Sequence, residues 1–124
     1  MTDILVVEDE PDISLMVKLD LELNGYAVEV SNDGYAALEA LRSRAFDAVL
    51  LDLRIPGPDG WAVLAEIRDN APAPAPVVIV LSAHASPGTA ERALEMGCSD
   101  YVTKPFVVQD LRRRLAAALA ARGD

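Results

Sequence analysis

The chain has 124 residues, of which 11 are basic and 20 acidic, and its formal net charge is −9 at pH 7. This length fits one domain, and we expect residues 1–124 to form a single one. Hydrophobic residues make up 52% of the sequence, which excludes an acidic disordered segment. The acidic balance also disfavours direct binding of nucleic acid, because negative charge repels phosphate.

The sequence gives no sign of secretion or membrane insertion. It has one cysteine, Cys98, which excludes an internal disulfide and a metal site built from cysteines, and suits a reducing compartment. The N-terminus lacks the basic segment and long apolar run of a signal peptide. No stretch approaches the roughly 20 apolar residues of a membrane span. We therefore expect a cytoplasmic location and no membrane partner.

Short apolar runs recur along the chain at the length of β-strands, at residues 4–7, 26–30, 48–51, 77–81 and 101–102. The first, third and fourth runs are continuously apolar, which is typical of strands covered on both faces of a parallel sheet. The second run alternates, as an edge strand does.

Helical patterns separate and follow these runs. The first begins at Pro11 and stops at Asn24 and Gly25, since proline favours the first helical position and glycine the end. Later helices are predicted to begin after capping residues, and the last helix runs from about residue 107 to 121. The predicted caps are the segment Ser31, Asn32 and Asp33 for the second helix, Asp59 for the third and Ser86 for the fourth. The alternation predicts an α/β fold in which a five-stranded parallel sheet is doubly wound, with helices on both faces.

The first helix carries two apolar rows. One consists of Leu15, Leu19 and Leu23, and the other is formed by Ile13, Met16, Val17 and Leu21. One row must face the sheet. We favour burial of both rows over an exposed strip for docking a partner helix.

The chemistry is expected where the strands end, because ligands of open α/β sheets bind at the carboxyl edge. The residues that follow four of the strands are Glu8 with Asp9, Asp52, Ser82, and Thr103 with Lys104. Taken singly, each has an ordinary structural explanation: Glu8, Asp9 and Glu10 suit the start of the first helix, and Lys104 suits the surface. Together they predict a site.

The residue types at this edge suit phosphoryl chemistry. Neighbouring carboxylates repel unless they share a proton or a cation, and oxygen ligands in an incomplete shell favour Mg²⁺. A lysine and a hydroxyl can balance the charge of a phosphoryl group. The sequence has no glycine-rich nucleotide-binding loop. The remaining candidate nucleophile is therefore a carboxylate.

Four segments resemble, in order and spacing, the motifs of the receiver domain of two-component response regulators. They are residues 5–10, 49–57, 80–83 and 97–106, so the resemblance covers nearly the whole chain. It implies a flavodoxin-like sheet with strand order 2-1-3-4-5. It also implies that the domain accepts a phosphoryl group from a sensor histidine kinase or a histidine phosphotransfer protein, with only slow autophosphorylation and autodephosphorylation of its own.

The resemblance assigns a role to each site residue. Asp52 is the phosphoacceptor, and Lys104 and Ser82 contact the phosphoryl group. Ser82 and Tyr101 form a switch pair, and a cis peptide bond is expected between Lys104 and Pro105. Mg²⁺ is expected to be held by Glu8, Asp9, Asp52 and the backbone carbonyl of Arg54.

The resemblance also implies surfaces for partners. Phosphorylation is expected to switch the face formed by the fourth helix, fifth strand and fifth helix. Transcription-factor relatives dimerise symmetrically through this face, and Asp100 with Arg114 resembles one of their salt bridges. A solvated charged face explains these two residues equally well. Kinases dock on the first helix in relatives.

Two other functions remain as alternatives. A phosphatase of the haloacid-dehalogenase type also uses an aspartyl nucleophile with Mg²⁺, but it carries a second aspartate where this chain has Arg54. A flavodoxin-like binding module leaves Asp52, Ser82 and Lys104 unexplained. We also hypothesise that Arg54 or His84 partly shields the phosphoryl group from water. The sequence does not decide between a stand-alone regulator and a fragment of a longer one.

Overall fold

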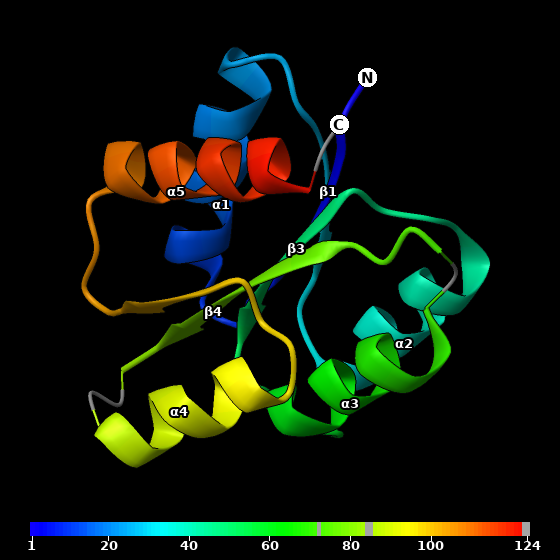
Figure 1. Cartoon of the computed structure of the whole chain (residues 1–124). Helices are drawn as coiled ribbons and strands as arrows, with labels where there is room; N and C mark the ends of the chain where they lie inside the picture. Colours follow the sequence, from blue (N-terminus) through cyan, green and yellow to red (C-terminus); the bar gives the residue numbers. More distant parts are fainter. Residues whose placement is uncertain (72, 84–85, 123–124) are drawn as a thin grey trace.

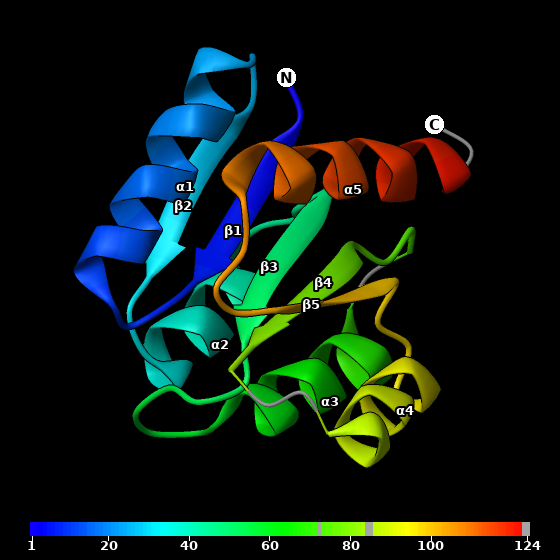
Figure 2. The same cartoon turned by 90° about the vertical axis from the view of Figure 1, so that its left-hand side faces the viewer.

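Five parallel strands form one sheet in the order β2-β1-β3-β4-β5, which confirms the predicted strand order. The structure is a computed structural model that describes residues 1–71, 73–83 and 86–122. Figure 2 shows the sheet with β2 at one edge and β5 at the other. The strands are β1 (Asp3–Val7), β2 (Ala27–Ser31), β3 (Ala48–Asp52), β4 (Val77–Ser82) and β5 (Asp100–Thr103).

Five helices cover both faces of this sheet. Figure 1 shows α1 and α5 on one face and α2, α3 and α4 on the other, as expected for a doubly wound sheet. Among the described residues no helix combines the length and the apolar character that crossing a membrane requires. The helices are α1 (Pro11–Leu23), α2 (Gly34–Ser43), α3 (Gly60–Asn70), α4 (Pro87–Glu95) and α5 (Val108–Ala121).

The central strands are buried on both faces, as their continuous apolar runs predict. Successive residues of a strand point to opposite faces. In β1, Leu5 and Val7 therefore pack into a cluster with residues of α2 and α3, whereas Ile4 and Val6 pack with residues of α1 and α5. The edge strand β2 is only half-buried along most of its length.

Two of the three predicted helix caps form. Asp33 accepts a hydrogen bond from the backbone N–H of Ala36 at 2.8 Å, and Asp59 accepts one from Ala62 at 3.0 Å. Ser86 precedes α4 as predicted but makes no capping hydrogen bond with its side chain. Pro87 at the first position of α4 explains why the helix still begins there.

The outer apolar row of α1 is exposed, so the prediction that both rows are buried was wrong. Val17 and Leu21 are 0% and 1% exposed and pack toward the sheet. Leu15, Leu19 and Leu23 are 56%, 51% and 86% exposed. The physical reason is that α1 packs on one side only, against β1, β2 and α5.

Candidate functional site

The carboxyl edge of the sheet buries polar side chains where the strands cease to be apolar. Glu8 follows β1 and is 0% exposed, Asp52 ends β3 and is 4% exposed, and Ser82 ends β4 and is 1% exposed. Lys104 follows β5, and its backbone N–H donates to the carbonyl oxygen of Ser82 at 2.8 Å. Parallel pairing of the strands thus brings together residues that are far apart in the sequence.

Lys104 lies at the centre of this site. Its ammonium Nζ is 2.6 Å from Glu8 Oε1, 2.8 Å from Asp52 Oδ2 and 3.4 Å from Glu10 Oε1. Only 11% of the Lys104 side chain is exposed. The convergence of Glu8, Asp52 and Lys104 is what their positions after parallel strands predicted.

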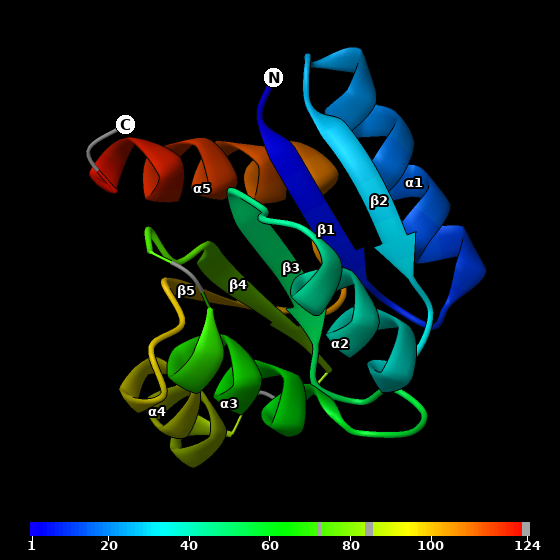
Figure 3. The same cartoon turned by 90° about the vertical axis from the view of Figure 1, so that its right-hand side faces the viewer.

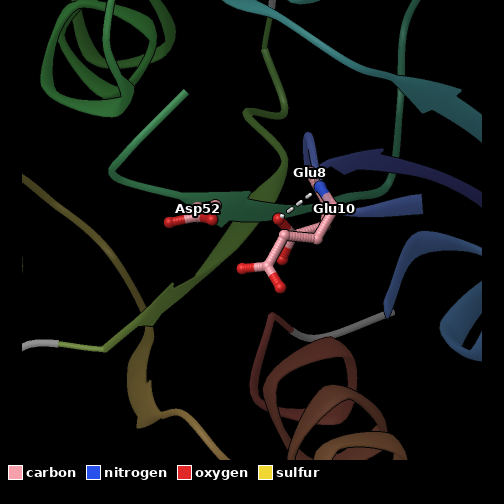
Figure 4. Close-up of side chains that lie close together, drawn as sticks. All are labelled: Glu8, Glu10 and Asp52. Atoms are coloured by element: carbon pink, nitrogen blue, oxygen red, sulfur yellow. Dashed lines mark hydrogen bonds between the residues drawn. The ribbon is translucent and has the colours of Figure 1, made fainter. Parts of the chain in front are cut away.

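Glu10 joins this cluster, although its place in the sequence predicts only an acid at the start of a helix. Carboxylate oxygens of Glu8, Glu10 and Asp52 all lie within 4.8 Å of one another (Figure 4). The Glu10 N–H donates to Glu8 Oε2 at 3.2 Å, and the Glu10 side chain makes no cap for α1. Asp9 is exposed and lies outside this cluster, so its role as a metal ligand stays a prediction.

Burial dominates the electrostatics of Glu8. It raises the pKa of this carboxyl from 4.5 to about 7; the nearby Asp52 adds to the rise and Lys104 opposes it. For Lys104, burial alone lowers the pKa, but hydrogen bonds and attraction to Asp52 and Glu8 outweigh burial and raise it above its ordinary value. The ammonium is therefore charged at neutral pH and holds the two buried acids together.

The donor set fits a divalent cation. Full ionisation of the three carboxyls would leave two negative charges beyond the one that the Lys104 ammonium balances, and a bound divalent cation would favour that ionised state. Glu8 Oε1 is buried, and the one partner it has among the described residues is the Lys104 ammonium at 2.6 Å. Carboxylate oxygens that lack a full set of partners are the ligands Mg²⁺ prefers. Glu8, Glu10 and Asp52 could therefore hold a metal ion.

The backbone next to Asp52 and Lys104 also shapes the site. The Arg54 N–H donates to Asp52 Oδ1 at 3.0 Å, and the Lys104–Pro105 peptide bond is cis, as expected. Tyr101 is half-buried and packs against the apolar cluster on the α2 and α3 side. His84, which we grouped with Arg54 as a shield of the phosphoryl group, lies outside the described residues.

A family model described as the response regulator receiver domain matches residues 4–116. The chain belongs to this family. Receiver domains are signalling switches that histidine kinases phosphorylate, and they are not a family of catalytic enzymes. The function predicted from the sequence, that of a two-component response regulator receiver, is therefore confirmed.

A curated relative supports the same family. This receiver domain is 33% identical to the response regulator ArlR of Staphylococcus epidermidis over 124 residues, which are 100% of this chain and 55% of ArlR. The chain thus spans about half the length of the curated relatives it matches.

Solved structures of receiver domains are similar over nearly the whole chain. The receiver domain of the Francisella response regulator 1452 has a TM-score of 0.87 and 31% identity, with 98% of each chain covered. The receiver domain of the sensor histidine kinase PA1611 from Pseudomonas aeruginosa has a TM-score of 0.85 and 34% identity, with 96% of this chain and 98% of that chain covered. The latter holds a magnesium ion in its active site cleft.

Proposed function

We propose that Asp52 is the phosphoacceptor of this receiver domain. The observation that carries the proposal is the contact between buried Asp52 and Lys104 at 2.8 Å, at the edge where Glu8 and Glu10 supply two more carboxylates. The donor is the phosphohistidine of a sensor histidine kinase or of a histidine phosphotransfer protein.

The transfer step uses the chain's own charged groups. A carboxylate oxygen of Asp52 forms a bond to phosphorus while the N–P bond of the phosphohistidine breaks, and the bonding electron pair stays on the imidazole. Lys104 then pairs with a phosphoryl oxygen, and Ser82 donates a hydrogen bond to another. Slow autophosphorylation from small acyl phosphates and slow hydrolysis by water are proposed as the domain's only intrinsic activities.

We propose Mg²⁺ as the cofactor. The residues proposed to hold it are Glu8, Asp9, Asp52 and the backbone carbonyl of Arg54, and the geometry adds Glu10 as a further candidate. When bound, Mg²⁺ neutralises charge on the transferring phosphoryl group. The magnesium ion in the cleft of the PA1611 receiver domain supports this choice of metal.

The phosphoacceptor proposal is tested by intact mass after incubation with acetyl phosphate and Mg²⁺, followed by a rapid quench. The expected result is a gain of one phosphoryl group in the unmodified chain, and no gain in Asp52→Asn or in a sample with chelator. A gain that persists in Asp52→Asn would show that another residue is phosphorylated. Parallel thermal unfolding checks that Asp52→Asn is folded.

A symmetric dimer through α4, β5 and α5 is proposed as the output of the switch, in which Ser82 and Tyr101 rearrange. Within one chain Arg114 already pairs with Asp100 at 3.0 Å and with Asp110 at 3.0 Å. In a dimer through these residues, ion pairs within one chain must therefore be replaced by ion pairs between the two chains. Sedimentation with and without beryllofluoride tests this: the expected dimer forms only with beryllofluoride and is lost in Arg114→Ala.

The exposed row of α1, formed by Leu15, Leu19 and Leu23, is proposed as the surface on which the kinase docks. These side chains form an apolar strip on a helix whose opposite side is buried. Leu19→Asp is expected to slow phosphotransfer from a kinase while leaving phosphorylation by acetyl phosphate unchanged. Equal slowing with both donors would contradict docking.

We also propose that residues 1–124 act as one receiver domain in the cytoplasm. Both apolar clusters share a single sheet, which supports one folding unit. The only cysteine, Cys98, is a buried free thiol, which is compatible with a reducing compartment.

A further inference from the structure

The loop that follows β3 is held against the first turn of α2. The backbone N–H of Gly34 donates a hydrogen bond to the carbonyl oxygen of Pro56 at 2.9 Å. The ring of Tyr35 lies so close to Gly57 that a Cβ atom there would be 2.7 Å from Tyr35 Cε2. Figure 3 shows this loop, drawn in green, passing beside the start of α2. We call these four residues, Gly34, Tyr35, Pro56 and Gly57, the α2 clamp.

Two glycines allow this close approach. A Cβ atom on Gly34 would lie 1.8 Å from the carbonyl oxygen of Pro58, so a side chain at this position would displace the loop. Gly57 has a φ of +76°, in the region that favours glycine, and a side chain there would meet the Tyr35 ring. Any larger residue at either position would therefore disturb the α2 clamp.

Neither the core nor the stability of α2 explains Tyr35. The residue is 70% exposed. Alanine has a higher helix propensity than tyrosine, so the aromatic ring does not strengthen the helix itself. The ring instead lies against Gly57, and this contact restrains the loop at the residue that follows Pro56, whose carbonyl oxygen accepts from Gly34.

The clamped loop is the segment that carries Arg54. Its base is closed by two hydrogen bonds, from the Arg54 N–H to Asp52 Oδ1 at 3.0 Å and from the Gly60 N–H to the Leu53 carbonyl at 3.0 Å. The α2 clamp adds a restraint in the middle of the loop. A ligand that is restrained before the metal arrives loses less freedom on binding, and its affinity is higher for that reason.

We propose that Tyr35 is a positioning residue for the metal site. It touches neither the metal nor the phosphoryl group, and it acts by restraining the loop that carries the Arg54 backbone carbonyl. The inference rests on the proposed function, in which that carbonyl is a ligand of Mg²⁺. The chemical consequence is a higher affinity for Mg²⁺ with no change in the transfer step itself.

The first test is a calorimetric titration with Mg²⁺ of the wild type, Tyr35→Ala and Tyr35→Phe. Tyr35→Ala is expected to weaken Mg²⁺ binding about fivefold, whereas Tyr35→Phe keeps the ring and is expected to bind Mg²⁺ with wild-type affinity. Glu39→Gln, one turn further along α2, is the matched control and is expected to bind as the wild type does. If the wild type binds no Mg²⁺, the proposed function fails. If the wild type binds and Tyr35→Ala binds equally well, only the positioning role is overturned.

Kinetics separate positioning from a general loss of structure. In Tyr35→Ala the Mg²⁺ concentration for half-maximal phosphorylation by acetyl phosphate is expected to rise about fivefold, while the rate at saturating Mg²⁺ stays within about twofold of wild type. A fall in the saturating rate with an unchanged half-maximal concentration would overturn the proposal.

A double-mutant cycle tests the contact between Tyr35 and Gly57 directly. Gly57→Ala forces a side chain into the ring, and this clash is absent when Tyr35 is already alanine. The expected loss of Mg²⁺ affinity caused by Gly57→Ala is therefore larger in the wild type than in Tyr35→Ala, by about threefold or more. If Gly57→Ala causes the same loss of Mg²⁺ affinity in the wild type and in Tyr35→Ala, the two effects are additive and the ring does not restrain the loop.

Discussion

The interior of the sheet and its carboxyl edge belong to the same strands but differ in what they bury. In the interior, β1, β3 and β4 supply apolar side chains such as Leu5, Leu50 and Ile79, all 0% exposed. At the edge, Glu8 and Asp52 are buried to nearly the same extent. Apolar burial stabilises by about 25 cal/mol per Å², whereas a buried charge costs free energy unless it is paired. The interior therefore stabilises the fold, and the edge uses part of that stability to hold reactive groups.

The largest effect on stability is expected in the interior. Leu50→Ala removes a side chain that is completely buried between β3 and the helices α1 and α5. The expected loss in the free energy of unfolding is about 3 kcal/mol, because burial is lost and a cavity remains. Urea unfolding measures it. A loss below about 1 kcal/mol would contradict the role given to the interior.

A smaller loss is expected when the edge loses its cation. Lys104→Met leaves Glu8 and Asp52 facing each other without the ammonium, and the metal-free free energy of unfolding is expected to fall by about 2 kcal/mol. Added Mg²⁺ should stabilise this variant more than the wild type, since no ammonium competes for the carboxylates. Urea unfolding with chelator and with excess Mg²⁺ gives both values. Equal stability of variant and wild type in chelator would be the contrary result.

The pH dependence of stability should report the burial of Glu8. The pKa of Glu8 rises from 4.5 to about 7 on folding, so the folded chain binds this proton more tightly than the unfolded chain. The stabilisation is complete below pH 4.5 and is lost as pH rises through about 7.

The metal-free wild type should therefore be less stable at about pH 8 than at about pH 5, by an amount on the order of 1 kcal/mol that Glu8→Gln removes. Thermal unfolding in chelator at a series of pH values measures the slope. A slope that Glu8→Gln leaves unchanged would assign the effect to other groups.

The smallest effect concerns the lifetime of the phosphorylated state. If Arg54 partly shields the phosphoryl group from water, Arg54→Ala is expected to shorten the phosphoaspartate lifetime by about two- to fivefold, which corresponds to less than about 1 kcal/mol in the barrier. Loss of acid-labile phosphate over time measures the lifetime, and Arg54→Lys serves as the control that keeps the charge. An unchanged lifetime in Arg54→Ala would refute the shielding hypothesis.

Much of the fold could be predicted because strands buried on both faces must be continuously apolar. The run at residues 48–51 appears as β3, Ala48–Asp52. The run at residues 101–102 underestimates β5, which extends from Asp100 to Thr103 through pairing with Ile79 and Ser82 of β4. Backbone hydrogen bonds extend the strand to polar residues at its two ends, and the hydropathy of the sequence does not reveal these bonds.

The site was predictable where it depends on strand ends and unpredictable where it depends on loops. Glu8, Asp52 and Lys104 converge because parallel strands end at one edge. The approach of Glu10 depends on the path of the chain between β1 and α1, for which no periodic pattern exists. The exposure of Leu19 likewise depends on whether another element packs on the outer side of α1. The spacing of apolar residues within a helix cannot predict that packing.

The most direct test of the central claim is to trap the phosphorylated residue. The chain is phosphorylated with acetyl phosphate and Mg²⁺, reduced with borohydride and digested, and the peptides are analysed by mass spectrometry. Reduction of an aspartyl phosphate yields homoserine, and homoserine is expected at position 52 alone. Homoserine at Asp9 or another aspartate, or the corresponding hydroxynorvaline at a glutamate, with no homoserine at position 52, would contradict the claim that the buried carboxyl edge is built to phosphorylate Asp52.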